Sequence, residues 1–133
     1  MKIKNKKILT VTENLKKAFN DNVKYFPAKI NFIIHKNLTL LESLTEEIYQ
    51  TRDSIVDYYG IPDETEQNKF FIPEDKRKKA QNELDELLEL EQEVPLMIFK
   101  FNQIEDLDFT SNQMEAMMFM IEEDSDEDED QVE

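Results

Sequence analysis

The residues that could carry out catalysis are few in this chain, and they do not form catalytic patterns. There is no cysteine, a single histidine, His35, and a single glycine, Gly60. A nucleophilic triad needs a base beside its nucleophile, a zinc site usually needs Cys or His ligands, and a phosphate-binding loop needs several glycines. His35 stands beside Lys36 within a helical pattern, which is typical of a helix-surface residue. The sequence therefore predicts no catalytic residue, no cofactor and no enzymatic activity.

Carboxylates are abundant, and their spacing near the end of the sequence raises the question of a calcium loop. Oxygen-bearing side chains alternate at Asp124, Asp126 and Asp128. An EF-hand loop also requires a glycine at its sixth position and a glutamate at its twelfth. This stretch has no glycine, and Glu133 comes two positions too early. We therefore expect no metal site, and the acids are typical of solvated helix faces and of a like-charged tail.

The charge of the chain is polarised along the sequence. The net charge is −15: residues 1–60 carry ten basic and seven acidic residues, whereas residues 61–133 carry six and twenty-four. Nine acids lie in the last twelve residues, so residues 1–121 carry only −6. Because an acidic chain is repelled by phosphate backbones, we expect no nucleic-acid partner. Nucleic-acid binding by the basic N-terminal region and mimicry of nucleic acid stay open as weaker alternatives. Attraction within the chain between the basic region and the acidic half explains the charge pattern at least as well as nucleic-acid binding does.

The elements that would position any site are mainly helices, as the single glycine indicates. After a strand-like start at Met1–Ile3, apolar residues recur at helical spacing from Ile8 to Phe19, with Asn5 as the expected N-cap. A signal peptide and a transmembrane segment are not apparent, which favours a cytoplasmic location and no membrane partner. We expect one helical domain over residues 1–121 and a disordered acidic tail over residues 122–133.

A long central helix is the strongest structural prediction. Pro27 suits its first turn, the pattern continues to Tyr59, and Gly60 ends it. Its apolar residues repeat as the a/d seam of a coiled coil over roughly four heptads, about 48 Å of helix. The seam comprises Ile30, Ile34, Leu41, Leu44, Ile48, Ile55 and Tyr58, with Asn37 and Thr51 as its polar members.

A second leucine-rich helix should pack against the long one as an antiparallel hairpin. It begins at Pro73, runs until Val94-Pro95 ends it, and directs one face inward, formed by Ala80, Leu84, Leu87, Leu88 and Glu91. We expect short strands at residues 96–101 and 104–109, the first of them pairing with residues 1–4. A last short helix follows, capped by Thr110 or Ser111 and ending at Ile121.

The seam and the acidic helix face are the surfaces from which a partner could be recognised. A buried polar residue at a seam position can set the register of a coiled coil, although a solvated helix end is the simpler interpretation of Asn37. The long helix could also pair with a second copy of the chain. The candidate partner-binding residues are Asn37, Leu41, Leu44, Ile48, Glu83, Glu86, Glu89, Asp126 and Asp128.

Three segments resemble a family of small uncharacterised proteins, a domain of unknown function, encoded by phages and prophages of Gram-positive bacteria. They are "MKIKN" at the start, the Pro-led helix "FPAKINFIIHKNLTLLESLTEEIYQTRDSIVDYYG", and the block "NELDELLELEQEVPLMIFKFNQIEDLDFTSNQMEAMMFMIEE". The resemblance covers most of residues 1–123 and leaves the acidic tail outside. It implies a phage origin and a bacterial host cytoplasm, and it assigns a role to no residue.

The combined expectation is a non-enzymatic phage or prophage protein that binds another protein. We expect an inhibitor or modulator of a host or anti-phage defence enzyme, because the chain is small and electrically polar and carries no catalytic constellation. The alternative is a virion assembly factor, such as a tail chaperone or a minor structural protein, whose partner would be a phage tail protein. The second alternative is a mimic or binder of nucleic acid.

Overall fold

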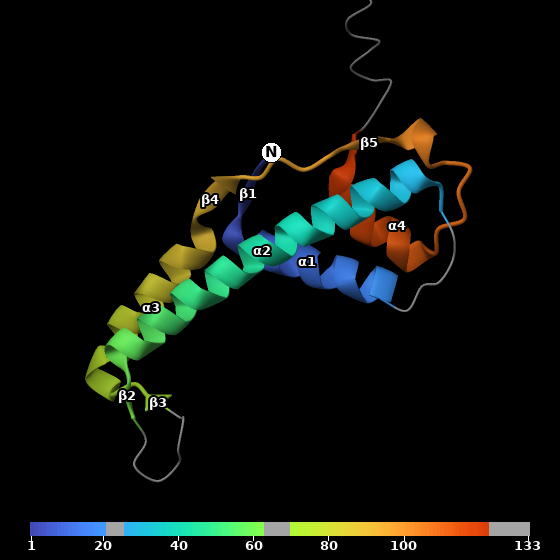
Figure 1. Ribbon diagram of the computed structural model, residues 1–133. Coiled ribbons are helices and arrows are strands. Elements are labelled where there is room, and N and C mark those ends of the chain that lie inside the picture. Colours follow the sequence, from blue (N-terminus) through green and yellow to red (C-terminus); the bar gives the residue numbers. More distant parts are fainter. Residues whose placement is uncertain (21–25, 63–69, 123–133) are drawn as a thin grey trace, which may run out of the picture.

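The computed structural model describes residues 1–20, 26–62 and 70–122, and these form a mainly helical structure (Figure 1). The predicted fold class is confirmed: a long antiparallel helical hairpin, an N-terminal helix, short strands and a terminal helix. The α-helices of the described residues are α1 (Asn5–Asn20), α2 (Ala28–Tyr59), α3 (Glu74–Glu89) and α4 (Ser111–Met117). The short strands are β1 (Lys2–Lys4), β2 (Ile61–Pro62), β3 (Phe70–Phe71), β4 (Glu91–Glu93), β5 (Phe99–Lys100) and β6 (Ile121–Glu122).

Helix α2 begins and ends where the sequence indicates. Pro27 precedes its first turn with φ −54°, and Gly60 ends it in an extended conformation while its N–H donates to the carbonyl of Val56. The predicted seam holds only along the first two thirds of the helix. Its buried residues are Ile30, Ile33, Ile34, Asn37, Leu41 and Ile48. Further on, Ile55 is half-buried and Tyr58 is 79% exposed. In this part of the helix α3 covers one side of α2 and leaves the other side open to solvent (Figure 1).

Helix α3 ends earlier than predicted. It stops at Glu89, and Leu90 turns into an extended conformation with φ −62° and ψ 136°. The next residues, including Glu91, form β4 rather than a further helical turn. Residues Ala80 and Leu87 are buried, as the predicted inner face requires, whereas Leu84 is half-buried.

The expected pairing of residues 1–4 with residues 96–101 is wrong, because β1 pairs antiparallel with β4. In this register Lys2 lies opposite Glu93 and Lys4 opposite Glu91. Opposite charges on facing strands stabilise such a pair. Asn5, the expected N-cap, reinforces the junction instead: its backbone N–H donates to the carbonyl of Leu90, and its side-chain amide donates to the carbonyl of Leu87, each at 2.8 Å.

The C-terminal third contains less strand and more turn than predicted. The expected strand at 96–101 is reduced to β5, which is followed by a 3₁₀ turn, η1 (Phe101–Gln103). Residues 104–109 are not a strand: Ile104 and Leu107 donate to carbonyls three residues back, which turns the chain. The turn places Phe109 against Phe26, with ring centroids 4.4 Å apart. Aromatic packing at this corner replaces the expected strand hydrogen bonds.

The last helix starts as predicted and ends differently. Thr110 caps α4 by accepting from the N–H of Gln113, whose side chain accepts from the N–H of Thr110. This reciprocal pair is a capping box. The helix continues as a 3₁₀ turn, η2 (Met118–Met120), and Ile121, expected in a final helical turn, lies in β6. Strand β6 pairs parallel with β5, with Ile121 beside Phe99.

The core lies where α1, α4 and the segment after β4 meet the first half of α2 (Figure 1). Helix α1 contacts α2, α3 and α4, so it is the central element of the packing. The second half of α2 and α3 extend away from this core as a hairpin arm (Figure 1). The largest fully buried side chains are Phe99, Ile8, Leu15, Leu41, Ile104, Met117, Met120, Val94 and Asn37.

Candidate functional site

The outward face of α3 is the candidate site that the structure leaves accessible. Because Ala80, Leu84 and Leu87 recur at helical spacing toward α2, residues about half a turn away face solvent. A shallow open groove on this exposed side is lined by Asn82, Glu83, Asp85, Glu86 and Glu89. The predicted candidates Glu83, Glu86 and Glu89 therefore lie together on one helix.

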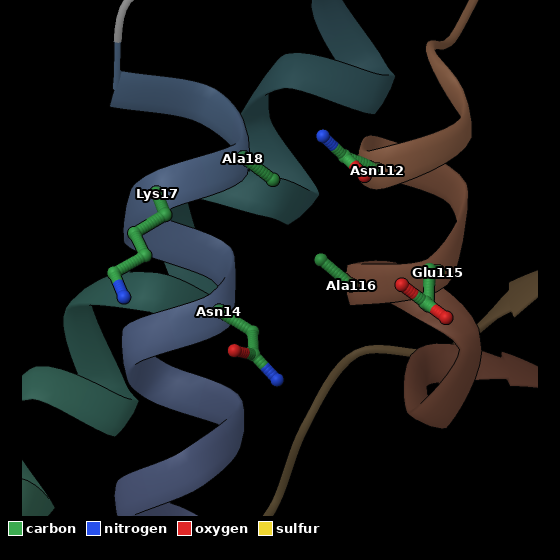
Figure 2. Close-up of a pocket in the computed structure, with 6 residues that line it drawn as sticks. All are labelled: Asn14, Lys17, Ala18, Asn112, Glu115 and Ala116. Carbon is green, nitrogen blue, oxygen red and sulfur yellow. The ribbon is translucent and has the colours of Figure 1, made fainter.

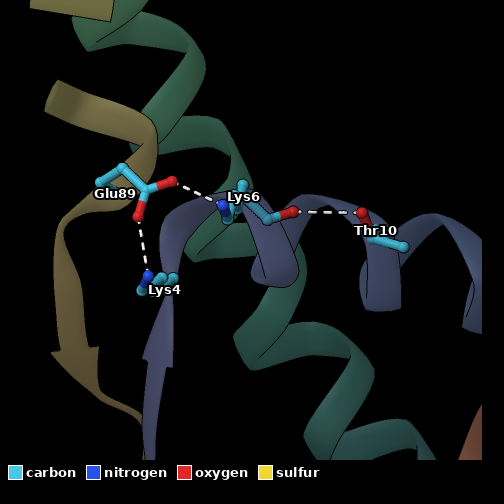
Figure 3. Close-up of polar contacts among 4 residues, drawn as sticks. All are labelled: Lys4, Lys6, Thr10 and Glu89. Carbon is cyan, nitrogen blue, oxygen red and sulfur yellow. Dashed lines mark hydrogen bonds and ion pairs between the residues drawn. The ribbon is translucent and has the colours of Figure 1, made fainter. Parts of the chain in front are cut away.

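Glu89 is already neutralised within the chain. Its carboxylate accepts from Lys4 Nζ at 2.7 Å and from Lys6 Nζ at 2.5 Å (Figure 3). These hydrogen bonds lower the pKa of Glu89 to about 2 and raise the pKa of Lys4 above its ordinary value. The three side chains are about half exposed. Glu89 thus joins β1 and the first turn of α1 to the end of α3, and the cluster of Lys4, Lys6 and Glu89 carries a net charge of +1.

Glu83 also has an internal partner. The hydroxyl of Tyr59 donates to a carboxylate oxygen of Glu83, which ties the end of α2 to α3. This hydrogen bond to the carboxylate raises the pKa of the Tyr59 hydroxyl. Of the carboxylates that line the groove, Asp85 accepts a hydrogen bond from Gln81 of the same helix, and Glu86 makes no side-chain hydrogen bond or ion pair with another described residue. These two are therefore not held by a residue of another element.

The α3 face can offer negative charge, but it is not arranged as a metal centre. Across residues 1–20, 26–62 and 70–122, no group of three or more His, Asp or Glu side chains is placed to hold a metal ion. A row of exposed carboxylates on a rigid helix suits a basic surface of another molecule, because such a surface pairs with it at several points. The chemistry that this arrangement supports is recognition.

The seam candidates lie inside the chain, so the expectation that they form a partner surface is wrong for this structure. Leu41 and Ile48 are buried, and Leu44 is half-buried against the core. Asn37, expected at a solvated helix end, is only 1% exposed. Along this part of α2 the seam is therefore buried by the chain itself, whereas Thr51 and Tyr58 further along the helix stay exposed.

The side chain of Asn37 is a structural junction. Its amide donates to the carbonyl of Met97 and to the sulfur of Met120, and its oxygen accepts from the N–H of Met97, each at 2.8 Å. A buried amide with its hydrogen bonds satisfied fixes the relative position of the segments that it joins. Asn37 therefore positions the chain before β5 and the end of η2 on α2.

The remaining candidates are placed as follows. Asp126 and Asp128 lie outside the described residues. His35 is exposed on α2, as expected for a helix-surface residue. The described part of the chain contains no helix that is both long and apolar enough to cross a bilayer.

A recess with a volume of about 270 Å³ lies between α1 and α4 (Figure 2). It is lined by Asn14, Lys17 and Ala18 of α1 and by Asn112, Glu115 and Ala116 of α4, with Ala18 and Ala116 between the two helices and the Lys17 side chain directed away from α4 (Figure 2). Gln113 bridges the same helices by donating to the carbonyl of Ala18 at 3.2 Å. One lysine and one glutamate are the charged groups lining this recess, so it resembles a packing defect between helices more than a reactive site.

Two features of the α3 surface were missed in the sequence. One is the run of four basic residues Lys76–Lys79, all exposed in the first turns of α3. The run is visible in the sequence, but it has meaning only beside the acids that follow on the same helix. The other is the neutralisation of Glu89, which depends on residues more than eighty positions away.

Comparison of the chain with protein families, curated proteins and solved structures finds no match.

Proposed function

We propose that this chain is a non-enzymatic phage or prophage protein that inhibits or modulates a host or anti-phage defence enzyme by binding to it. The phage setting comes from the sequence resemblance. The observation that carries the binding role is the exposed carboxylate face of α3, centred on Asp85 and Glu86. A basic surface of the target, such as a groove that normally holds a nucleic acid, is its natural complement.

The hairpin arm supports this role because it presents the face on a rigid element. Helix α3 is joined to α2 by the Tyr59–Glu83 hydrogen bond and to α1 and β1 through Asn5, Lys4 and Lys6. A surface held in one conformation loses little entropy on binding, so more of its interaction energy appears as affinity. The arm also projects from the core (Figure 1), which suits insertion into a concave partner.

The basic N-terminal region offers little support for nucleic-acid binding. Lys4 and Lys6 pair with Glu89, Lys16 lies 3.6 Å from Glu42, and Lys17 lies 3.1 Å from Glu13. Lysines paired in this way have less charge to offer a phosphate backbone. The attraction within the chain therefore favours a protein partner over a nucleic acid.

The proposal is tested by affinity capture of the tagged chain from infected host cells, followed by mass spectrometry. The expected result is recovery of one host or defence protein by the wild type and by the control variant E46Q/E47Q, and its loss with D85N/E86Q. Glu46 and Glu47 are exposed on α2, so the control removes the same number of charges from another surface. Recovery of phage tail proteins alone would favour the assembly factor instead.

A truncation separates the acidic tail from the α3 face. Removing residues 123–133 keeps β6, which ends at Glu122, and removes eight carboxylates. We expect this truncation to weaken target binding in a salt-dependent manner without abolishing it, because the tail would act only through long-range attraction. Complete loss of binding at every salt concentration would place the recognition in the tail rather than on α3.

A further inference from the structure

After an acidic first turn, Glu74 and Asp75, the exposed side of α3 separates its charges by sign along the helix axis. The basic run Lys76–Lys79 occupies the N-terminal half, and Glu83, Asp85, Glu86 and Glu89 occupy the C-terminal half. Between described residues, no ion pair engages Lys78, Lys79 or Glu86. A helix surface with a positive segment followed by a negative one complements an antiparallel copy of itself.

The spacing of these charges satisfies the symmetry that such a pair requires. Lys78 and Asp85 are seven residues apart, as are Lys79 and Glu86. Two helical turns separate the members of each set, so both lie on the same flank of the helix, about 10 Å apart along its axis. Around the helix, Lys78 and Asp85 lie on one flank of Asn82, and Lys79 and Glu86 lie on the other flank. A two-fold axis at Asn82 therefore brings Lys78 to Asp85 of the second copy, and Lys79 to Glu86 of the second copy.

The ends of the helix fit the same arrangement. Asp75 and Glu89 are each seven residues from Asn82, so an antiparallel copy brings Asp75 of one chain to Glu89 of the other. Two carboxylates would repel each other, but Glu89 already binds Lys4 and Lys6 (Figure 3). Asp75 would thus meet a cluster with a net charge of +1. Beyond these charges lie two exposed apolar residues, Phe71 before the helix and Leu90 after it, 48% and 54% exposed.

We infer that the outward face of α3 is a self-association surface, on which a second copy of this chain packs antiparallel about a two-fold axis at Asn82. The contact consists of four symmetric charge pairs, Lys78–Asp85 and Lys79–Glu86 in both directions, with Phe71 of each copy near Leu90 of the other. Exposed charge pairs contribute little each, so the dimer is weak and sensitive to salt. The seam of α2 takes no part, because its apolar residues up to Ile48 are buried or half-buried within the chain.

Self-association through α3 would affect the proposed binding role, but it does not depend on that role. Asp85 and Glu86 serve both contacts, so a second copy and a basic partner compete for the same face. Self-association can be measured on the purified chain alone, whereas partner binding cannot. A chain that stays monomeric but still captures a host protein would overturn the dimer and leave the proposed function intact. A chain that dimerises but captures no host protein would support the dimer and overturn the proposed function.

The test uses sedimentation velocity of the full chain over a wide range of concentration at low ionic strength. The wild type should shift from monomer to dimer, and added salt should reverse the shift. K79E or E86K alone should weaken dimerisation by about tenfold or more, because each places like charges opposite each other twice. The double variant K79E/E86K should dimerise like the wild type, and an equimolar mixture of the two single variants should form a heterodimer.

Matched controls separate this contact from a change in net charge. K36E and E47K alter exposed residues of α2 and carry the same charges as K79E and E86K respectively. Both controls should dimerise as the wild type does, within a factor of two or so for their altered net charge. The inference is overturned if the wild type stays monomeric at low salt, or if the double variant and the mixture associate no better than the single variants. Circular dichroism of each variant confirms that it is folded.

Discussion

Replacing Asn37 by alanine tests whether the buried amide holds the C-terminal third of the chain on α2. The substitution removes the donor to the carbonyl of Met97 and the acceptor from its N–H, both at 2.8 Å. It also removes the contact between the Asn37 amide and the sulfur of Met120, which is fully buried. The segment before β5 then loses the side chain that fixes it.

The expected cost follows from these contacts. Each of the two hydrogen bonds to Met97 contributes about 1 kcal/mol net, and groups left without a partner add to the loss. The space left by the smaller side chain adds about 1 kcal/mol. Alanine is the better helix former by about 0.6 kcal/mol, which offsets part of the cost. We expect N37A to lower the free energy of unfolding by about 2–3 kcal/mol, or the melting temperature by about 10 °C.

The assay is urea unfolding followed by circular dichroism, at a pH near neutrality. N31A is the matched control, because Asn31 also lies on α2 but is exposed and donates a single hydrogen bond, to the carbonyl of Phe26 at 3.0 Å. We expect N31A to cost about 1 kcal/mol or less. An N37A variant that loses no more stability than N31A would refute the view of Asn37 as a junction.

The variant N37D gives a second test of the burial of position 37. N37D keeps the shape of the side chain but exchanges the amide donor for a carboxylate that faces the carbonyl of Met97. Burial and the loss of the donor disfavour the charged form, so the pKa of this carboxyl should lie above its ordinary value. A raised pKa in the folded state means that destabilisation is greatest at neutral pH and is relieved as the pH falls and the carboxyl is protonated. Destabilisation independent of pH would contradict the burial of this position.

Three further outcomes are expected. Lys4 and Lys6 lower the pKa of Glu89 to about 2, so the ionised Glu89 stabilises the fold above the ordinary glutamate pKa, and this stabilisation is lost as the pH falls. E89Q should therefore be less stable than the wild type at neutral pH, and its urea midpoint should decline less than that of the wild type between about pH 5 and pH 2. T110A removes the cap of α4 and should cost about 1 kcal/mol in urea unfolding, whereas S111A should cost little. L15A leaves a cavity at a residue with 0% exposure and should cost about 2–5 kcal/mol by the same measurement, against under 1 kcal/mol for the exposed T10A.

The helices were predictable because their signals are local. Pro27, Gly60 and Thr110 act on backbone groups within one turn of themselves, so their effects can be deduced without knowing the rest of the chain. The apolar spacing of α2 likewise predicts an inward face. The short strands were less predictable: strands of two or three residues show too little alternation to identify them or their partners.

The candidate site was predictable only in part. Glu83, Glu86 and Glu89 share the exposed side of α3, as their spacing implies, but their availability differs. Tyr59 occupies Glu83, and two lysines occupy Glu89. Those partners come from α2, β1 and α1, and the spacing of residues within α3 carries no information about them.

The sequence by itself determines that the chain is mainly helical, where α2 begins and ends, and that its charge is divided between a basic start and an acidic second half. The tertiary structure decides what those residues are free to do. In the sequence, Asn37 could equally lie at a solvated helix end. Its burial follows from the segment around Met97, sixty residues later, which lies against it and accepts its hydrogen bond. Burial and ion pairing depend on which distant segments meet, and those contacts follow from the packing of the whole chain rather than from any local pattern.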